Sequence, residues 1–382
     1  MNTLSEVAAV SERRDLGLDI LRGFSLVGVG FANLMVFNTD AGTIEAYAAL
    51  FSAGINKYLV SFFTVFLWGK YFPVFAFLFG LSAALALYSK GVKPFFKRAL
   101  VLGGLGVLQL IFIWRGDVLH QYALMSLLLL PLRKLAVSTR LWLIAGLYLF
   151  SFAGIFLLPV VEPTTLVYPV STQEIYQSGN FFQIFQRRMD LYLNEILAVD
   201  SLLYQLRIFA WLLSGYILGE KKRFRKYFQK PEAYKAVLLS AGIMAAAAFL
   251  SQFFGLRGSE NFSLEQQILK ALLSAVFYTG DVFLLISFPV ALYFTGFASN
   301  ILNRLAPFGK MTLTHYLTQN LLYSLIFYGY GLGLYGKLSP VALWLGYPVL
   351  VVSQILLSEW WLKRFGNGPM ETLVRYLTTS GK

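Results

Sequence analysis

A few ionisable and amide side chains lie inside long apolar stretches of this chain, and these are the residues that could do chemistry. The first apolar stretch contains Asp19, Arg22 and Asn33. Burying a charged group inside a bilayer costs free energy unless the group is paired or hydrated, so its presence indicates a functional role. Arg22 and Asn33 are 11 residues apart, which places them on one helix face, about 16 Å apart along the axis. The simpler alternatives are a headgroup ion pair for Asp19 and Arg22, and an interhelical hydrogen bond for Asn33.

Two charges, an imidazole and an amide lie close together between two later apolar stretches. The segment reads Trp114-Arg115-Gly116-Asp117-Val118-Leu119-His120-Gln121-Tyr122. Helical spacing places Asp117, His120 and Gln121 on one face, where the carboxylate could fix the tautomer of the imidazole and raise its basicity. Such a pair commonly supports general-base catalysis. The alternative is a helix cap by Asp117 with an exposed His120.

The second histidine lies near the start of another apolar stretch. Helical spacing puts His315 on one stripe with Thr312, Gln319 and Tyr323. The imidazole could accept a proton from a substrate, or it could form a structural hydrogen bond to a neighbouring helix. Three further charges lie in or beside apolar stretches, and the sequence cannot pair them: Lys70, Arg207 and Asp281.

The composition is that of a membrane protein. Of the 382 residues, 57% are hydrophobic and only 13% are charged, which argues against a soluble fold. The apolar runs are continuous, so they predict an all-α polytopic membrane protein and exclude an outer-membrane barrel. Without cysteine and with only two histidines, we expect no thiol chemistry and no metal site. The ten expected spans are residues 18–37, 71–88, 99–114, 118–132, 141–160, 201–219, 236–254, 271–297, 311–330 and 341–362.

Basic residues are distributed unequally between the two sides of the expected spans. With the N-terminus in the cytoplasm, 22 of the 32 Lys and Arg residues fall in cytoplasmic segments, which predicts that both termini lie inside. The positive charge therefore needs no nucleic acid as a partner, because anionic lipid accounts for it. Segments 58–68 and 182–197 could cover a site from outside. We expect one integral membrane domain, 1–382, with a cytoplasmic head at 1–17, an extracytoplasmic loop at 162–200, a basic cytoplasmic loop at 220–235 and a cytoplasmic tail at 363–382.

Short motifs spread over nearly the whole chain resemble those of a known family. Four of them are Leu18-Asp19-Ile20-Leu21-Arg22-Gly23-Phe24, Trp114-Arg115-Gly116-Asp117-Val118-Leu119, Gly309-Lys310-Met311-Thr312-Leu313-Thr314 and Gly368-Pro369-Met370-Glu371. With them the chain resembles the YeiB-like family of uncharacterised bacterial integral membrane proteins. The resemblance implies a multipass protein of the bacterial cytoplasmic (inner) membrane. It also favours, as site residues, Arg22, Asn33, Asp117, Tyr122 and Gln319.

That family is in turn distantly similar to membrane acyltransferases, including heparan glucosaminide N-acetyltransferases and bacterial glycan O-acyltransferases. Those enzymes share an Arg-Gly pair and a polar residue 11 positions after the Arg, which correspond here to Arg22-Gly23 and Asn33. The O-acyltransferases have a catalytic His at that position. The glucosaminide enzymes have Asn there and an essential His 11 residues later, where this chain has Ile44. The expected base is therefore missing, and His120 or His315 would have to replace it.

Two functional hypotheses follow, from different classes of protein. In the first, the protein is an acyltransferase that uses cytoplasmic acyl-CoA and a glycan or small-molecule acceptor outside. Arg22, Lys93 and Arg98 would hold the CoA phosphates, Asn33 would orient the thioester carbonyl, and His120 with Asp117 would deprotonate the acceptor. In the second, it is a proton-coupled transporter or permease for a small molecule or an envelope precursor. The proton carriers would then be Asp281, Asp117 or His315.

A third hypothesis is a structural role in envelope assembly, without turnover. The lipid bilayer is a partner in all three cases. The oligomeric state stays open at this level, a homodimer included.

Overall fold

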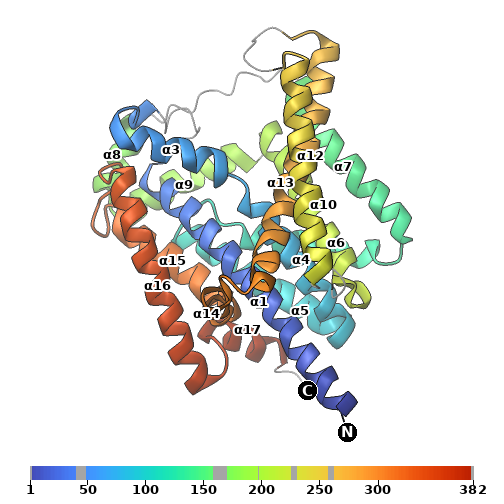
Figure 1. Cartoon of the computed structure of the whole chain (residues 1–382). Helices are drawn as coiled ribbons and strands as arrows, with labels where there is room; N and C mark the ends of the chain where they lie inside the picture. Colours follow the sequence, from blue (N-terminus) through green and yellow to red (C-terminus); the bar gives the residue numbers. More distant parts are fainter. Residues whose placement is uncertain are drawn as a thin grey trace.

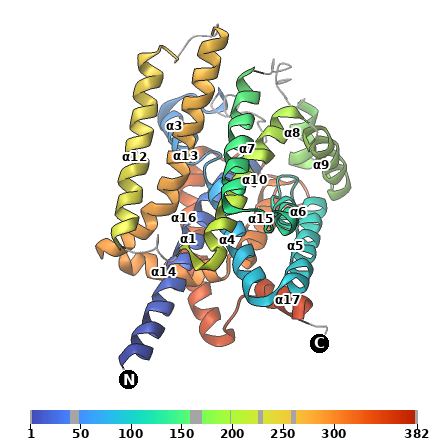
Figure 2. The ribbon, with the colours of Figure 1, turned by 90° about the vertical axis from the view of Figure 1, so that its right-hand side faces the viewer.

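The computed structural model describes residues 2–39, 49–157, 170–196, 198–224, 230–256 and 262–379. In these ranges the chain forms α-helices and one short 3₁₀ helix, η1 (Glu220–Lys222), and no strand. Figures 1 and 2 show most of the long helices running side by side in one bundle. The helices of the first half are α1 (Asn2–Asn38), α3 (Gly54–Phe66), α4 (Tyr71–Lys90), α5 (Val92–Phe112), α6 (Leu119–Leu132), α7 (Val137–Leu157), α8 (Val170–Ser178) and α9 (Phe181–Ile196). Those of the second half are α10 (Val199–Gly219), α12 (Lys230–Phe253), α13 (Leu264–Thr295), α14 (Ser299–Lys310), α15 (Thr312–Phe327), α16 (Pro340–Phe365) and α17 (Pro369–Thr379).

Eight segments of the described chain are long and apolar enough to cross a membrane. A bilayer core of about 30 Å requires about 20 apolar residues in a helix. The all-α, polytopic class predicted from the sequence is therefore confirmed. The eight segments are Leu16–Asn38, Gly54–Lys90, Val92–Phe112, Val137–Gly154, Val199–Gly219, Pro231–Phe253, Leu264–Thr295 and Pro340–Phe365.

Two of the expected spans, 118–132 and 311–330, form helices that are short for a full crossing. Helix α6 has 14 residues and α15 has 16, so they are only about 21 Å and 24 Å long. Both helices begin within one residue of the expected start, and α15 ends at Phe327, three residues earlier than expected. The N-termini of both helices lie inside the protein and carry the polar groups described below.

Helix α1 is the central element, because it contacts α4, α13, α14, α15 and α16. It crosses α14 at glycines: a Cβ atom at Gly23 would overlap the Leu305 carbonyl, and one at Gly309 would overlap the Asp19 carbonyl. Small residues allow such close backbone approach between membrane helices. The crossing holds Arg22 beside the N-terminus of α15. Helix α1 also begins at Asn2, so the helix continues through the expected cytoplasmic head, 1–17.

Helices α3, α8 and α9 lie at the end of the molecule opposite α17 and the start of α1 (Figure 1). They include the two segments expected to cover a site from outside, 58–68 and 182–197, of which residue 197 lies outside the described residues. Helix α9 buries Ile184, Arg188 and Leu191 against the bundle. The end with α14 and α17 carries basic segments that the sequence predicts to be cytoplasmic.

Candidate functional site

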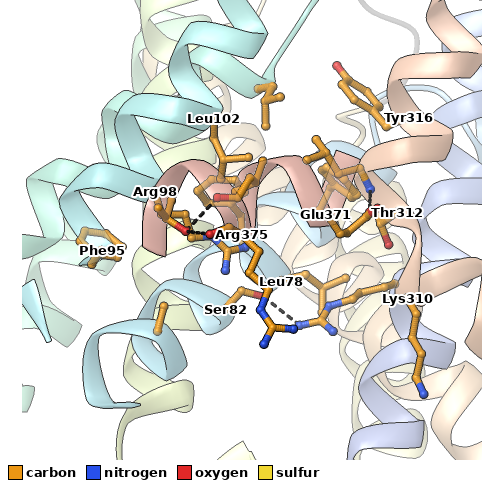
Figure 3. A pocket seen from close by; sticks show the side chains of 18 of the residues that line it. Leu78, Ser82, Phe95, Arg98, Leu102, Lys310, Thr312, Tyr316, Glu371 and Arg375 are labelled. Atoms are coloured by element: carbon orange, nitrogen blue, oxygen red, sulfur yellow. Dashed lines mark hydrogen bonds between the residues drawn. The ribbon is translucent and has the colours of Figure 1, made fainter. Parts of the chain in front are cut away.

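A cavity of about 390 Å³ lies among α1, α4, α5, α15 and α17. Its walls combine apolar side chains, such as Phe75, Leu78 and Phe79, with basic ones. Figure 3 shows Arg98, Arg375 and Lys310 around it, with Tyr316 and Lys310 at opposite ends of the labelled group. We call it the basic cavity, after the five cationic residues that line it: Arg22, Lys90, Arg98, Lys310 and Arg375.

Arg22 is held in the wall of the basic cavity by two neighbours. Its Nη1 donates to Asp19 Oδ1 at 2.8 Å, and its Nη2 donates to Ser82 Oγ of α4 at 3.0 Å. The Asp19 side chain is 8% exposed and that of Arg22 is 29% exposed. The ion pair expected from the sequence is therefore present. It orients the guanidinium toward a cavity inside the protein.

Glu371, on α17, caps the N-terminus of α15 at the same cavity. Its Oε1 accepts hydrogen bonds from the backbone N–H groups of Leu313 and Thr314, at 2.8 and 3.2 Å, and its Oε2 accepts from Thr314 Oγ1 at 2.6 Å. A carboxylate at this position satisfies free N–H groups and complements the helix dipole. The cap fixes α17 in place, and with it Arg375 in the cavity wall.

The far end of the basic cavity is formed by Tyr316 and Leu119, and it leads to a buried carboxylate. The Tyr316 hydroxyl donates to Asp117 Oδ1 at 2.9 Å. Asp117 Oδ2 accepts from the backbone N–H groups of Leu119 and His120, at 3.1 and 3.2 Å, and faces His120 Nδ1 at 3.0 Å. The Asp117 side chain is fully buried, so these four contacts compensate its charge.

His120 connects this carboxylate to the outer helix α9. Its Nε2 lies 2.9 Å from the Tyr192 hydroxyl, and its side chain is 13% exposed. Asp117 thus caps α6 and also holds His120, which is largely buried rather than exposed. Burial, and to a smaller extent the Asp117 charge, raise the pKa of Tyr192, so the phenol is protonated at neutral pH. The polar chain Tyr316, Asp117, His120 and Tyr192 is called the Asp117 chain below.

Three residues expected at the site form a separate polar row between α1, α15 and α16. Asn33 Nδ2 donates to Asn320 Oδ1 at 3.1 Å, Gln319 Nε2 donates to Gln354 Oε1 at 2.8 Å, and His315 Nε2 lies 2.6 Å from Ser358 Oγ. These six side chains are buried, and they are not among the residues that line the basic cavity. Asn33 therefore has the interhelical hydrogen bond that was the simpler alternative.

The remaining predicted site residues lie elsewhere. Tyr122 is buried and donates from its hydroxyl to the Phe72 carbonyl at 3.0 Å, which positions α6 against α4. Lys93 is exposed on α5 and is not a lining residue of the basic cavity. Asp281 pairs with Lys70, with Oδ2 and Nζ 2.6 Å apart. Arg207, which the sequence could not pair with either, lies over the Phe152 ring at 4.9 Å.

Sequence reasoning missed six residues of the site: Ser82, Tyr192, Lys310, Tyr316, Glu371 and Arg375. Lys310, Tyr316, Glu371 and Arg375 lie within or beside the motifs of the family resemblance, which was their only signal. Tyr192 had none, because its contact with His120 joins residues 72 positions apart. Among the described residues, no group of three or more His, Asp or Glu side chains is arranged to hold a metal ion.

Eight membrane-capable helices around a buried polar centre define a multipass membrane protein. Residues 218–381 match the family described as Protein of unknown function (DUF418). The chain is 28% identical to the uncharacterised protein YxaH of Bacillus subtilis (strain 168) over 389 residues, covering 94% of this chain and 93% of that protein. It is 25% identical to the uncharacterised protein YeiB of Escherichia coli (strain K12) over 390 residues, covering 96% of each. The chain is thus similar, over nearly its whole length, to uncharacterised proteins that include YxaH and YeiB, and no solved structure matches it.

Proposed function

We propose that this protein transfers an acyl group from cytoplasmic acyl-CoA to a glycan or small-molecule acceptor at the opposite membrane face. One observation carries the proposal. The basic cavity ends at Tyr316, and the Asp117 chain continues from there to the outer helix α9. This succession supports the proposal, in which the basic cavity binds the donor and the Asp117 chain supplies the base along the direction in which the acyl group would cross the membrane.

The basic cavity has the chemistry that an acyl-CoA requires. Basic side chains bind phosphates through charge-assisted hydrogen bonds, which the five cations of the wall can supply. Phe75, Leu78 and Phe79 offer an apolar surface to the pantetheine arm and the acyl chain. With about 390 Å³, the cavity has room for the arm, and the nucleotide would remain at the basic mouth.

His120 is the proposed general base, and Asp117 positions it. With Nδ1–H directed at the carboxylate, Nε2 carries the lone pair and is free to accept a proton. The Tyr192 hydroxyl, 2.9 Å from Nε2, marks where an acceptor O–H or N–H would bind. The acceptor gives its proton to Nε2, its oxygen or nitrogen bonds to the thioester carbon, the C–S bond breaks, and the leaving thiolate takes up the proton. Asn33 contacts Asn320 and has no contact with the Asp117 chain or the basic cavity, so the proposal gives it no part in this step.

The test uses purified full-length protein in lipid vesicles with labelled acetyl-CoA and envelope glycans as acceptor. We expect saturable CoA binding and transfer of label, both measured separately. His120→Gln should abolish transfer and leave CoA binding unchanged. His315→Gln is the matched control, because His315 contacts Ser358 and not the Asp117 chain, and it should retain transfer. Absence of CoA binding, or loss of transfer with the control alone, would contradict the proposal.

The Asp117 chain also favours a second candidate, proton-coupled transport. Hydroxyl, carboxylate and imidazole groups in contact over successive distances of 2.9, 3.0 and 2.9 Å could pass a proton between the basic cavity and the outer face. In that case vesicles should show His120-dependent proton uptake with a transported solute and no CoA binding. The two candidates therefore differ in one direct binding measurement.

A further inference from the structure

A second cavity, of about 840 Å³, lies on the other side of the bundle. Helices α7, α10 and α13 form most of its wall, and these helices contact one another; they lie side by side in Figures 1 and 2. From α7 it is lined by Val137, Leu141, Ile144, Ala145 and Tyr148. We call it the apolar cavity. It shares no lining residue with the basic cavity.

Two polar contacts hold α7 in place at either end of this cavity. Arg140 forms a bidentate ion pair with Glu220 of η1, at 2.8 and 3.0 Å. Ser151 donates to the Leu203 carbonyl of α10 at 2.6 Å. Arg140 and Ser151 are 11 residues apart, or about 16 Å along the helix, and the lining residues Leu141 to Tyr148 lie between them, with Val137 one turn before Arg140. The contacts therefore fix α7 relative to η1 and α10 along the cavity.

The wall of the apolar cavity offers hydrocarbon almost throughout. Its three small hydroxyl side chains donate to carbonyls of their own helices: Ser214 to Ala210, Ser287 to Phe283 and Thr279 to Ala275, each at 2.7 or 2.8 Å. Their polarity is thus used within the helices. The rings of Tyr148 and Trp211 meet edge to face at 5.9 Å, and the Tyr148 hydroxyl and Trp211 Nε1 are the two buried polar atoms that they add to this wall. A ligand of this cavity must therefore be mainly hydrocarbon.

One cation, Arg223, lines the apolar cavity at its cytoplasmic end. Glu220, the nearest acidic residue in sequence, is engaged by Arg140, and no carboxylate of the described residues forms an ion pair with Arg223. Arg223 also ends the run Lys221-Lys222-Arg223. Basic residues at the cytoplasmic surface attract anionic headgroups, each by about 1 kcal/mol. The polar end of the ligand should therefore be an anion.

We propose that the apolar cavity binds an anionic phospholipid of the cytoplasmic leaflet, with its phosphate at Arg223 and an acyl chain along Ala145 toward Trp211. Helix α12 contributes only Ala236 to the lining, so the lipid would enter between α7 and α12. The site does not depend on the acyltransferase proposal. It predicts a lipid that stays with the protein during purification and is selected by its headgroup.

The experiment is native mass spectrometry of the detergent-purified full chain with phosphatidylglycerol or phosphatidylethanolamine at equal concentration. We expect one phosphatidylglycerol molecule to be retained in preference to phosphatidylethanolamine. Ala145→Trp fills the cavity and should remove this lipid. Leu149→Trp is its matched control, because Leu149 lies on the same helix, is 44% exposed and does not line the cavity. The control should retain the lipid.

A second variant tests the headgroup contact without changing the packing of the cavity. It also keeps the proposal testable if Ala145→Trp does not fold. Arg223→Gln should reduce the preference for phosphatidylglycerol about fivefold, and Lys363→Gln, at the far side on α16, should not. Equal retention of both lipids by the wild type would mean surrounding bilayer lipid only, and would overturn the proposal. Equal loss with Leu149→Trp or Lys363→Gln would overturn it as well.

Discussion

The basic cavity and the apolar cavity both include cationic residues of the basic segments in their lining, yet their walls differ. Five cations line the first, and one cation lines the second. The polar groups of the first point into the cavity or onward to Asp117, whereas the hydroxyl groups of the second bond to their own helices. In a bilayer, buried charge persists only where contacts compensate it. The difference therefore separates a region suited to polar ligands and proton transfer from one suited to hydrocarbon.

The two regions also use ion pairs differently. In the basic cavity, Asp19 orients Arg22 toward the open space. Beside the apolar cavity, Arg140 and Glu220 tie α7 to η1, and Lys70 and Asp281 tie the start of α4 to α13. The first pair presents a charge to a ligand, and the other two hold helices together. Four sets of substitutions test this contrast.

The largest effect is expected for Asp117→Asn. An amide cannot hold the imidazole in the same tautomer, so we expect acyl transfer to fall about a thousandfold. The substitution is nearly isosteric and lies outside the apolar cavity, so phosphatidylglycerol retention should not change. Labelled transfer and native mass spectrometry measure the two quantities. Transfer at the wild-type rate would contradict the roles proposed for Asp117 and His120 in the mechanism.

A large loss of stability is expected for Lys70→Met. Asp281, which is 6% exposed, would lose its ion pair, and an unpaired buried carboxylate costs about 3 kcal/mol. Thermal unfolding in detergent should show a lower Tm, with CoA binding unchanged in the folded protein. The double variant Lys70→Met/Asp281→Leu removes both charges and should recover most of the stability. A single variant as stable as the wild type would contradict the structural role assigned to this pair.

A smaller effect on donor binding distinguishes two basic residues of α5. Arg98 lines the basic cavity and Lys93 does not, although the sequence suggested both as phosphate ligands. Arg98→Gln should weaken CoA binding about tenfold, because it removes a charge-assisted contact. Lys93→Gln should bind CoA as the wild type does. Equal weakening in both variants would show that the general surface charge, and not the cavity, attracts the nucleotide.

The smallest effect is expected for Asn33→Ala. The substitution removes the hydrogen bond to Asn320 and should cost about 1 kcal/mol of stability. Asn33 does not line the basic cavity, so the transfer rate per folded molecule should stay within about twofold. Thermal unfolding and labelled transfer check the two parts. Loss of transfer without loss of stability would show that Asn33 takes part in catalysis.

Several features of the site could be predicted from the chain alone because they are local. Asp117 and His120 are three residues apart, and Asp19 and Arg22 are three residues apart, so helical geometry brings each pair together. The stripe of His315, Gln319 and Tyr323 was also predicted, and all three side chains are buried. The starts of the short helices α6 and α15 were also predicted within one residue, because charged residues and glycine interrupt the apolar runs before them. The early end of α15 at Phe327 was not predicted, because the apolar run continues to Tyr330.

The sequence by itself determined the membrane class, the position of most long helices and the charge bias between the two ends, because hydropathy and helical periodicity act over a few turns of one segment. Only the tertiary structure decided that Tyr316 meets Asp117, that Glu371 caps α15, that Lys70 pairs with Asp281 and that Asn33 meets Asn320. Those partners are 57 to 287 residues apart. In a bilayer every helix presents similar apolar surface, so close packing at glycines and a few polar contacts choose which helices meet. These contacts depend on how all the helices pack together, so they cannot be predicted from any single segment of the sequence.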